Sequence, residues 1–381
     1  MMPQRLARYK TTLEQLERKG RLRRLSKASG YDFTSNDYLG LAGSPRMSAG
    51  VICALDRGVP VGAGGSRLLR GNHPEHEALE EEAAVFFGSE RMLYFGSGYT
   101  ANMAILATLP QSDDLIVYDE LVHASAHAGI GAGRATAVAV AHNDLNAFED
   151  TIRKWRDAGG KGHPWITVES LYSMDGDRAP LLELADVADR YDGFLLIDEA
   201  HATGVHGTNG RGFAAGLEGR DNVVVLHTCG KALGVSGALI GGSRILCDYL
   251  VNHARPFIYA TAPSPLAAAG VREALKIISE EPERREKLQT LIAYANEQRF
   301  SHLGCEGSGS QILPVIIGDN ARTLHIAEQM QANGFDIRAI RPPTVPANTA
   351  RLRIAVTLNV DAPTVSQVFE RLATVMAEGQ P

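Results

Sequence analysis

Short apolar runs alternate with amphipathic segments between residues 92 and 242. The strand-like runs, rich in β-branched residues, lie at 92–95, 115–118, 135–140, 165–169, 193–196, 223–226 and 237–242. Helix-like patterns lie between most of them, and such repeated βα units predict a mostly parallel sheet with helices on both faces. The run at 237–242 follows its predecessor too closely for a helical crossover, so we predict that it runs antiparallel.

The flanking segments have different patterns. Leu6, Leu13 and Leu16 stand at helical spacing among many charges, which predicts an amphipathic helix over 5–25 that lies on the body of the protein or on a partner. Residues after 264 are helix-rich with a break at Pro282. Residues after 300, with strand-like runs at 311–318, 335–340 and 351–357, indicate a smaller α+β domain. We therefore expect an arm (1–40), a large α/β domain (41–270), and interdomain helices with a small domain (271–381).

Composition narrows the classes of ligand. A chain of 381 residues with a formal net charge of -6 gives no general electrostatic reason to bind nucleic acid or an anionic membrane. No apolar run approaches the ~20 residues that span a bilayer, and the charged amino terminus does not resemble a signal peptide. Four cysteines without metal-ligand spacing indicate reduced thiols. We expect a cytoplasmic protein that binds small molecules.

Two predicted strands end on reactive side chains. The run at 193–196 leads to Asp198 and His201, and the run at 223–226 leads to Thr228 and Lys231. Parallel strands place such residues at one carboxyl edge, where open α/β sheets bind ligands. Lys231 stands among glycines with little other charge nearby, which favours a desolvated, nucleophilic amine over an ordinary surface lysine. Asp198 would need a cationic partner, such as a protonated pyridine nitrogen, or would merely cap the next element.

Three further strand ends carry candidate ligands. The segment GSGYTAN (96–102) begins a predicted helix, whose amide groups at Gly98 and Tyr99 suit a phosphate, with the Thr228 hydroxyl as a further donor. His123 begins another helix, and because no third ligand accompanies it and His127, a stacked imidazole fits better than zinc. Ser173 ends a further strand, and Asp175 and Asp177 beyond it are interpreted as turn residues. Asn36, in a turn-rich segment, could equally be a turn residue.

The glycine-rich segment 61–71 is not a nucleotide-binding loop. It lacks the lysine of a P-loop, and Arg67 stands where a dinucleotide-binding pattern begun at Gly62 would need its last glycine. A nicotinamide dehydrogenase is therefore disfavoured. His73 and His76 are expected to cap or flank the following helix rather than to bind metal.

The motifs TSNDYLGL, GSGYTAN, DELVHAS, ESLYSMDGD, IDEAHATGVHG and HTCGKALG together resemble those of the α-oxoamine synthases, a family of fold-type-I pyridoxal-phosphate enzymes. The resemblance covers nearly the whole chain. It implies a mostly parallel seven-stranded sheet and a Schiff base between Lys231 and pyridoxal 5'-phosphate. It also implies that Asp198 pairs with the pyridinium nitrogen, His201 approaches the ring hydroxyl, and His123 stacks on the ring. The rest of the implied cofactor shell is Gly98, Tyr99, Ser173 and Thr228.

The same resemblance extends to substrates. Segments 340–354, 64–73 and 141–145 look most like members that condense L-alanine with pimeloyl-CoA or a pimeloyl carrier protein in biotin biosynthesis. Members that use glycine with acetyl-CoA or succinyl-CoA are the alternative, and a non-catalytic protein that binds the cofactor is a remote one. The implied substrate contacts are Asn36, His123, Arg341, Thr344 and Arg23. Arg21 and Arg24 are alternatives to Arg23, because this chain lacks a short hairpin that many members have between Arg24 and Phe33. A homodimer with its site at the interface is also implied.

Overall fold

The computed structural model describes residues 4–378, which form two compact units. The larger unit comprises residues 36–173 and 177–288, and the described part of the smaller comprises residues 4–35, 174–176 and 289–378. The division falls inside the helix α11 (Pro282–Leu303). Each unit is described by itself. The predicted boundaries at residues 40 and 270, which separate an arm, a large domain and a small domain with interdomain helices, stay a prediction.

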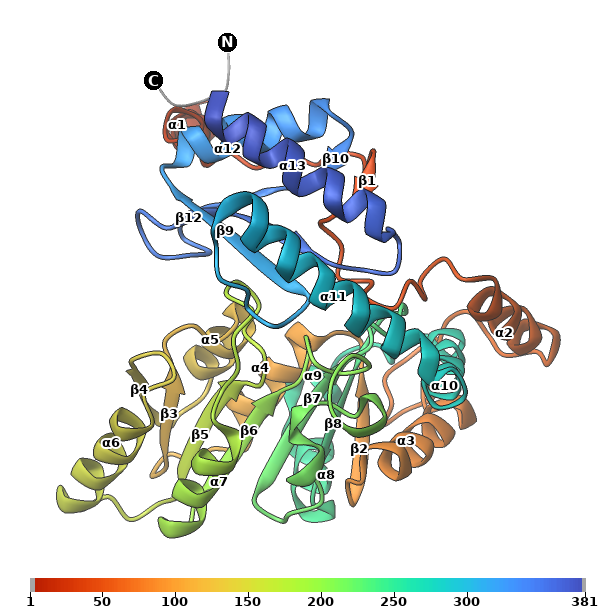
Figure 1. Cartoon of the computed structure of the whole chain (residues 1–381). Helices are drawn as coiled ribbons and strands as arrows, with labels where there is room; N and C mark the ends of the chain where they lie inside the picture. The colour runs from red at the N-terminus through yellow and green to blue at the C-terminus, as the bar shows by residue number, and fades with distance from the viewer. Residues whose placement is uncertain (1–3, 379–381) are drawn as a thin grey trace. The chain divides into compact units, whose positions relative to one another are not determined.

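The larger unit is built on a seven-stranded sheet (Figure 1) with strand order β2-β8-β7-β6-β5-β3-β4. Its strands are β2 (Arg91–Phe95), β3 (Leu115–Asp119), β4 (Thr136–Val140), β5 (Pro164–Glu169), β6 (Phe194–Asp198), β7 (Val223–Thr228) and β8 (Ala238–Gly242). β8 is antiparallel to both β7 and β2, while β7, β6, β5, β3 and β4 are mutually parallel. The predicted mostly parallel sheet and its antiparallel strand are both confirmed.

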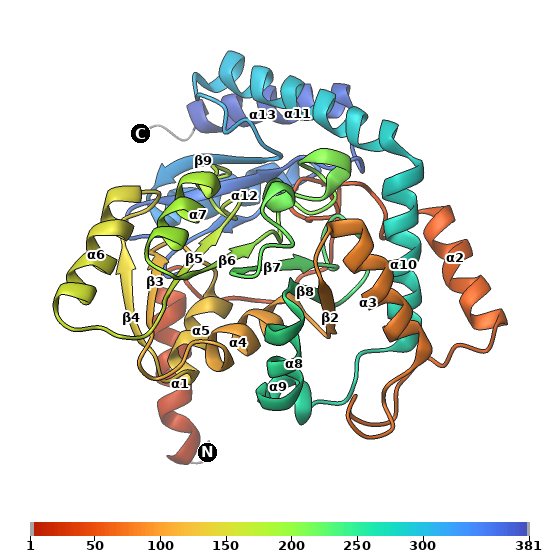
Figure 2. The ribbon, with the colours of Figure 1, turned by 90° about the horizontal axis from the view of Figure 1, so that it is seen from below.

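Helices cover both faces of this sheet. Figure 2 shows α7 on one side of the strands and α4, α5 and α8 on the other. The helices of the unit are α2 (Pro45–Asp56), α3 (Pro74–Phe87), α4 (Gly98–Thr108), α5 (Ala124–Ala132), α6 (Leu145–Asp157), α7 (Leu181–Arg190), α8 (Arg244–His253), α9 (Arg255–Ile258) and α10 (Pro265–Glu280), with the 3₁₀ turns η1 (Thr208–Gly210) and η2 (Phe213–Gly216). One apolar core joins the sheet to α4, α5, α8 and α9, and a second joins it to α6 and α7.

Strand alternation decides which core each strand-end residue faces. Successive side chains of a strand point to opposite faces. Leu196 and Leu226 belong to the core under α4 and α5, so Asp198 and Thr228, two positions on, point to that face. Glu169 is in register with Asp198, so its side chain points to the same face of the sheet. Glu199, one residue beyond Asp198, therefore points to the opposite face.

The smaller unit is an α+β structure. It has a three-stranded antiparallel sheet ordered β11-β12-β9, and a separate parallel pair of β1 with β10. The elements are α1 (Gln4–Arg18), β1 (Tyr31–Asp32), β9 (Ile312–Gly318), α12 (Asn320–Ala332), β10 (Phe335–Asp336), β11 (Ala339–Ile340), β12 (Ala350–Ala355) and α13 (Ala362–Glu378). The carboxyl-terminal part of α11 also belongs to it.

Two predictions about segments need correction. The helix expected over 5–25 ends at Arg18, because Gly20 adopts a left-handed backbone with φ +59°. Its Leu6 and Leu13 are exposed in this structure rather than covered. The run 335–340 is two short strands that pair with different partners, β1 and β12, instead of one strand.

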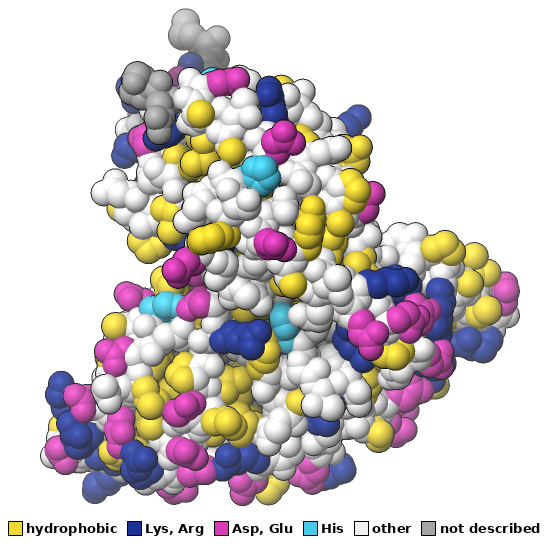
Figure 3. All heavy atoms as spheres, viewed as in Figure 1, with side chains coloured by type: hydrophobic (Ala, Val, Ile, Leu, Met, Phe, Trp, Pro, Cys, Tyr) yellow, Lys and Arg dark blue, Asp and Glu magenta, His cyan; other side chains and the backbone are white. Residues whose placement is uncertain are grey.

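The structure also shows the distribution of surface charge, the state of the cysteines and the character of the helices. On the face drawn in Figure 3, acidic and basic side chains are interspersed rather than separated into large areas of one sign. All four cysteines are free thiols. Within residues 4–378, no helix combines the length and the apolar character that crossing a membrane requires.

Candidate active site

Lys231 lies in the short connection between the antiparallel strands β7 and β8. The amide of Cys229 donates to the carbonyl of Gly237, and the amide of Val235 donates to the carbonyl of Cys229, both at 2.9 Å. Gly234 closes the turn with φ +67°, and a Cβ there would come within 2.5 Å of the backbone nitrogen of Ala42. The connection is therefore fixed by backbone contacts, and it holds the half-buried lysine at the end of β7.

A chain of hydrogen bonds leads away from this lysine. Lys231 Nζ lies 2.7 Å from His201 Nε2, and His201 Nδ1 lies 2.7 Å from the hydroxyl of Tyr38. The Tyr38 hydroxyl donates to Asn36 Oδ1 at 2.9 Å. If Tyr38 donates to Asn36, it accepts from His201 Nδ1–H, which leaves His201 Nε2 to accept from the lysine. Proton positions along this chain are thus mutually consistent.

Asp198 ends β6 with its carboxylate oriented by neutral donors. Its Oδ2 accepts from Asn102 Nδ2 at 2.7 Å, and its Oδ1 accepts from the amide of Ala200 at 2.9 Å. Asn102, on α4, also donates to the Ser125 hydroxyl at 3.0 Å. The side chain is 8% exposed, and no cationic residue among positions 4–378 forms an ion pair with it. A buried carboxylate of this kind is suited to a cationic ligand.

The amino terminus of α4 faces the end of β7. A Cβ placed on Gly98 would lie 3.5 Å from Thr228 Oγ1, so the first turn of the helix and this hydroxyl are neighbours. Ser97 caps the helix through the amide of Thr100. The amides of Gly98 and Tyr99, at the first two helical positions, have no acceptor within the helix. Together they form an array of donors suited to an anion.

His123 and Ser173 flank these groups from neighbouring strand ends. His123 caps α5 by accepting from the amide of Ser125 at 3.2 Å. Desolvation, with the positive charge of Lys231, keeps the pKa of His123 below its usual value against the opposing effect of Asp198. The ring is accordingly neutral near pH 7. Ser173 is buried and its amide donates to Glu169 Oε2 at 3.1 Å.

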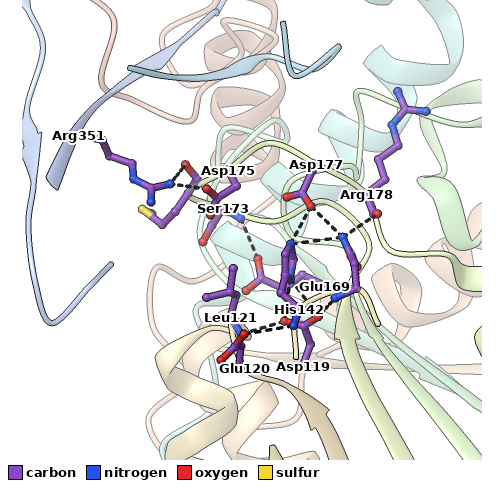
Figure 4. Close-up of polar contacts among 12 residues, drawn as sticks. Asp119, Glu120, Leu121, His142, Glu169, Ser173, Asp175, Asp177, Arg178 and Arg351 are labelled. Atoms are coloured by element: carbon purple, nitrogen blue, oxygen red, sulfur yellow. Dashed lines mark hydrogen bonds and ion pairs between the residues drawn. The ribbon is translucent and has the colours of Figure 1, made fainter. Parts of the chain in front are cut away.

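A cluster around His142 anchors the loop that carries Ser173 (Figure 4). His142 Nδ1 lies 2.9 Å from the fully buried Asp119, and its Nε2 lies 2.7 Å from Asp177. Desolvation alone would lower the pKa of His142, but the hydrogen bonds and charges of the two aspartates raise it to about 10. Asn143 donates to the same Asp177 oxygen. Asp177 is therefore an ion-pair partner as well as a turn residue.

The predicted substrate arginines lie in the smaller unit. Arg23 Nη2 donates to Thr344 Oγ1 at 3.3 Å, and Arg341 donates to the carbonyl of Gly20. Arg21, Arg23, Arg341 and Thr344 line a cavity of about 90 Å³. Desolvation, with a smaller effect of the charge of Arg23, lowers the pKa of Arg341. Arg24 instead pairs with Glu17 at 2.8 Å.

Asp175 also differs from the expected turn residue. It accepts a hydrogen bond from Arg351, a buried side chain of β12 in the smaller unit. The predicted capping role of His73 and His76 is confirmed. His73 and His76 form a capping box at the start of α3, and within the described part of the chain no group of side chains could hold a metal ion.

Three residues of the site were missed by sequence reasoning: Tyr38, Asn102 and Glu169. Each lies inside one of the sequence motifs, but the partners of Tyr38 and Asn102 are distant in sequence. Tyr38 and His201 are 163 positions apart, and Asn102 and Asp198 are 96 apart. Only for Glu169 was a signal present, since it ends the apolar run 165–169 as Asp198 follows the run 193–196.

Comparison with known proteins adds independent findings. A family model described as aminotransferase class I and II matches residues 29–372. A putative 8-amino-7-oxononanoate synthase of Geobacillus kaustophilus is 41% identical over 359 residues, which cover 90% of each chain. The 8-amino-7-oxononanoate synthase of Chromobacterium violaceum is 42% identical over 328 residues, which cover 85% of this chain and 83% of the relative.

Solved structures agree on the architecture. The serine palmitoyltransferase of S. paucimobilis matches with a TM-score of 0.88 at 22% identity, over 99% of each chain, and at that identity indicates the fold alone. The 8-amino-7-oxononanoate synthase from Francisella tularensis matches with a TM-score of 0.76 at 27% identity, over 92% of this chain and 98% of that one. The predicted fold-type-I architecture is confirmed.

Proposed function

The chain belongs to the 8-amino-7-oxononanoate synthase family of pyridoxal-phosphate-dependent acyltransferases, and on this basis we propose that it condenses L-alanine with a pimeloyl thioester. The products are 8-amino-7-oxononanoate, carbon dioxide and free thiol. The observation that carries the proposal is the meeting of Lys231, Asp198 and Thr228 at the ends of the adjacent strands β6 and β7.

The residues present fit pyridoxal phosphate. The donors at Gly98, Tyr99 and Thr228 suit its phosphate. The buried Asp198, which pairs with neutral donors alone, suits its protonated ring nitrogen. When bound, the cofactor supplies an electron-accepting ring that stabilises negative charge at the α-carbon of the amino acid. In the proposed arrangement Lys231 provides the covalent attachment, His201 approaches the ring hydroxyl, and His123 stacks on the ring beside Ser173.

Proton transfer at the α-carbon falls to Lys231. Its amine, once free, removes the α-proton of alanine and later returns a proton to the product. His201 Nε2, 2.7 Å from Nζ, orients the amine, and Tyr38 holds the opposite ring nitrogen of His201. Neutral His123 fits a stacking role better than a charged imidazolium, which would oppose the positive charge of Lys231. Asn36, at the end of this chain, is proposed to face the substrate.

We further propose that the enzyme is cytoplasmic and that it forms a homodimer. A dimer with its active site at the interface is what the resemblance to the α-oxoamine synthases implies. Sedimentation analysis of the purified protein tests the oligomeric state.

Lys231→Ala is expected to abolish covalent attachment of the cofactor and to lower kcat by about 10³-fold, in the range of a lost proton-transfer group. The measurement is borohydride reduction of the purified protein followed by mass analysis, together with the visible absorption spectrum. Lys276→Ala, which changes an exposed lysine of α10, is the control. A Lys231→Ala protein that still retains borohydride-fixed cofactor would refute the assignment.

The substrate half of the proposal has its own assay. Release of CoA from pimeloyl-CoA should require L-alanine and should give 8-amino-7-oxononanoate. Activity with glycine and acetyl-CoA or succinyl-CoA instead, or cofactor binding without any condensation, would exclude the proposed substrates while leaving the cofactor site intact. Comparison of pimeloyl-CoA with a pimeloyl carrier protein identifies the acyl donor.

The arginine cavity of the smaller unit is proposed to bind an anionic part of the substrate. Arg23 and Arg341 line this cavity, and none of its lining residues carries a carboxylate. Arg23→Ala and Arg341→Ala should each raise KM for the acyl substrate by about tenfold, as expected for one lost charge-assisted hydrogen bond, with little change in kcat. Arg24→Ala is the matched control, because Arg24 pairs with Glu17. An equal effect of all three changes would contradict the assignment.

A further inference from the structure

Glu169 is a buried carboxyl group that the proposed reaction does not use. It ends β5, is 3% exposed, and is in register with Asp198 on β6. Neighbouring strands lie about 4.8 Å apart, and residues in register face the same side of the sheet. Two carboxyl groups therefore stand side by side on the face that carries Thr228.

The hydrogen bonds of Glu169 are incomplete for an ionised carboxylate. Its Oε2 accepts from the amide of Ser173 at 3.1 Å, while Oε1 is buried and has no hydrogen-bond partner among residues 4–378. Figure 4 shows the side chain directed at the turn that carries Ser173. A charged oxygen buried without a donor is far costlier than a neutral one, and protonation removes the charge.

The surrounding charges favour the protonated form. Burial and then the charge of Asp198 raise the pKa of Glu169 to about 8, against the opposing effects of Lys231 and the Ser173 amide. Asp119, at the end of β3, acts in the same direction as Asp198 but is paired with His142 from the loop after β4.

We propose that Glu169 is a positioning residue that works as a neutral carboxylic acid. It fixes the turn that carries Ser173 through the Ser173 amide, and it leaves Asp198 as the single negative charge on this face of the strand ends. An ionised Glu169 would compete with Asp198 for the same cationic ligand. The inference deepens the proposed function and rests on it only for the identity of the cofactor, since stability of the cofactor-free protein tests it separately.

Glu169→Gln is the informative change, because it keeps the shape and the acceptor oxygen but cannot ionise. In the cofactor-free protein, the pKa of Glu169 is about 8 in the folded state, whereas that of an unfolded glutamate is about 4.3. The folded state therefore binds more protons between these pH values, so the stability of the protein falls as pH rises from about 4.3 to about 8. Thermal unfolding across this range should show a decline in wild type that is smaller in Glu169→Gln. Glu199, whose pKa burial raises to about 7, titrates in both proteins and cancels in the difference.

Cofactor affinity provides the second measurement. Near pH 7, Glu169→Gln should bind pyridoxal phosphate within about twofold of wild type, and Glu169→Ala about tenfold more weakly, through loss of the Ser173 contact. Glu183→Gln, at an exposed position of α7, is the control. The proposal is overturned if Glu169→Gln binds as weakly as Glu169→Ala, or if its stability follows the same pH dependence as wild type. Failure of Lys231→Ala to lose attachment would instead contradict the proposed function and leave these two results unaffected.

Discussion

Carboxyl groups at neighbouring strand ends differ in charge because their immediate partners differ. Desolvation opposes ionisation of Asp119, but the hydrogen bond from His142 and two backbone amides keep its pKa below the usual value. Asp198 is held by Asn102 and the amide of Ala200. Glu169 has one amide partner, and its pKa rises to about 8. A single charge facing the proposed ring therefore results from how many donors each side chain receives.

Tyr38→Phe tests the hydrogen-bond chain at the same scale. The change removes the contacts to His201 and Asn36 while keeping the ring, which is fully buried. We expect kcat/KM to fall about tenfold, corresponding to one hydrogen bond, because His201 loses the partner that orients its ring toward Lys231. Tyr191→Phe, which removes a hydroxyl that contacts Glu149, is the control for loss of a tyrosine hydroxyl. Unchanged kinetics in Tyr38→Phe would show that His201 is oriented by other contacts.

Sequence reasoning found the residues whose position follows from a local rule. Asp198, Thr228 and Lys231 follow apolar runs, and the edge of a parallel sheet brings such ends together. Tyr38 has no such rule, since its hydroxyl meets His201, which is 163 positions away in the sequence. Long-range pairs of this kind depend on packing rather than on periodicity.

At the scale of the elements, side-chain contacts fix the loop between β5 and α7 at two positions, Ser173 and Asp177. Ser173 is fixed by Glu169, and Asp177 by His142, which also contacts Asp119 from β3. Three consecutive strand ends are thus tied together by one protonated imidazole. Sequence patterns predicted these strands well but predicted neither the ion pairs in the loop nor the division of 335–340, because a two-residue strand carries almost no periodic signal.

His142→Asn is expected to destabilise the protein by about 3 kcal/mol, because it leaves the buried Asp119 without its cation. The raised pKa of His142 means that its contribution is complete below its unfolded pKa of about 6.5 and is lost as pH rises through about 10. Wild type should therefore lose stability between these values, as measured by chemical unfolding, and His142→Asn should lose less. His253→Asn, on α8, is the comparison. Parallel pH curves for wild type and His142→Asn would contradict the ion-pair cluster.

For the larger unit taken as a whole, the sheet order was less predictable than the strands. The sequence indicated alternation of strands and helices and the antiparallel β8, but no pattern indicated that β2 lies at the edge beside β8. That pairing joins residues 91–95 to residues 238–242. The resemblance to a known family supplied the architecture, whereas periodicity supplied only its components.

The contact between Gly98 and Thr228 has a consequence for the order of folding. The two are about 130 positions apart, and the helix that begins at Gly98 follows β2, whose single pairing partner within residues 4–378 is β8. Closing so long a segment is slow compared with forming local helices. During refolding from denaturant, helical circular dichroism should therefore recover before the capacity to bind pyridoxal phosphate, and simultaneous recovery would exclude this order. A newly made chain would acquire the proposed phosphate-binding turn only after β8 has been synthesised.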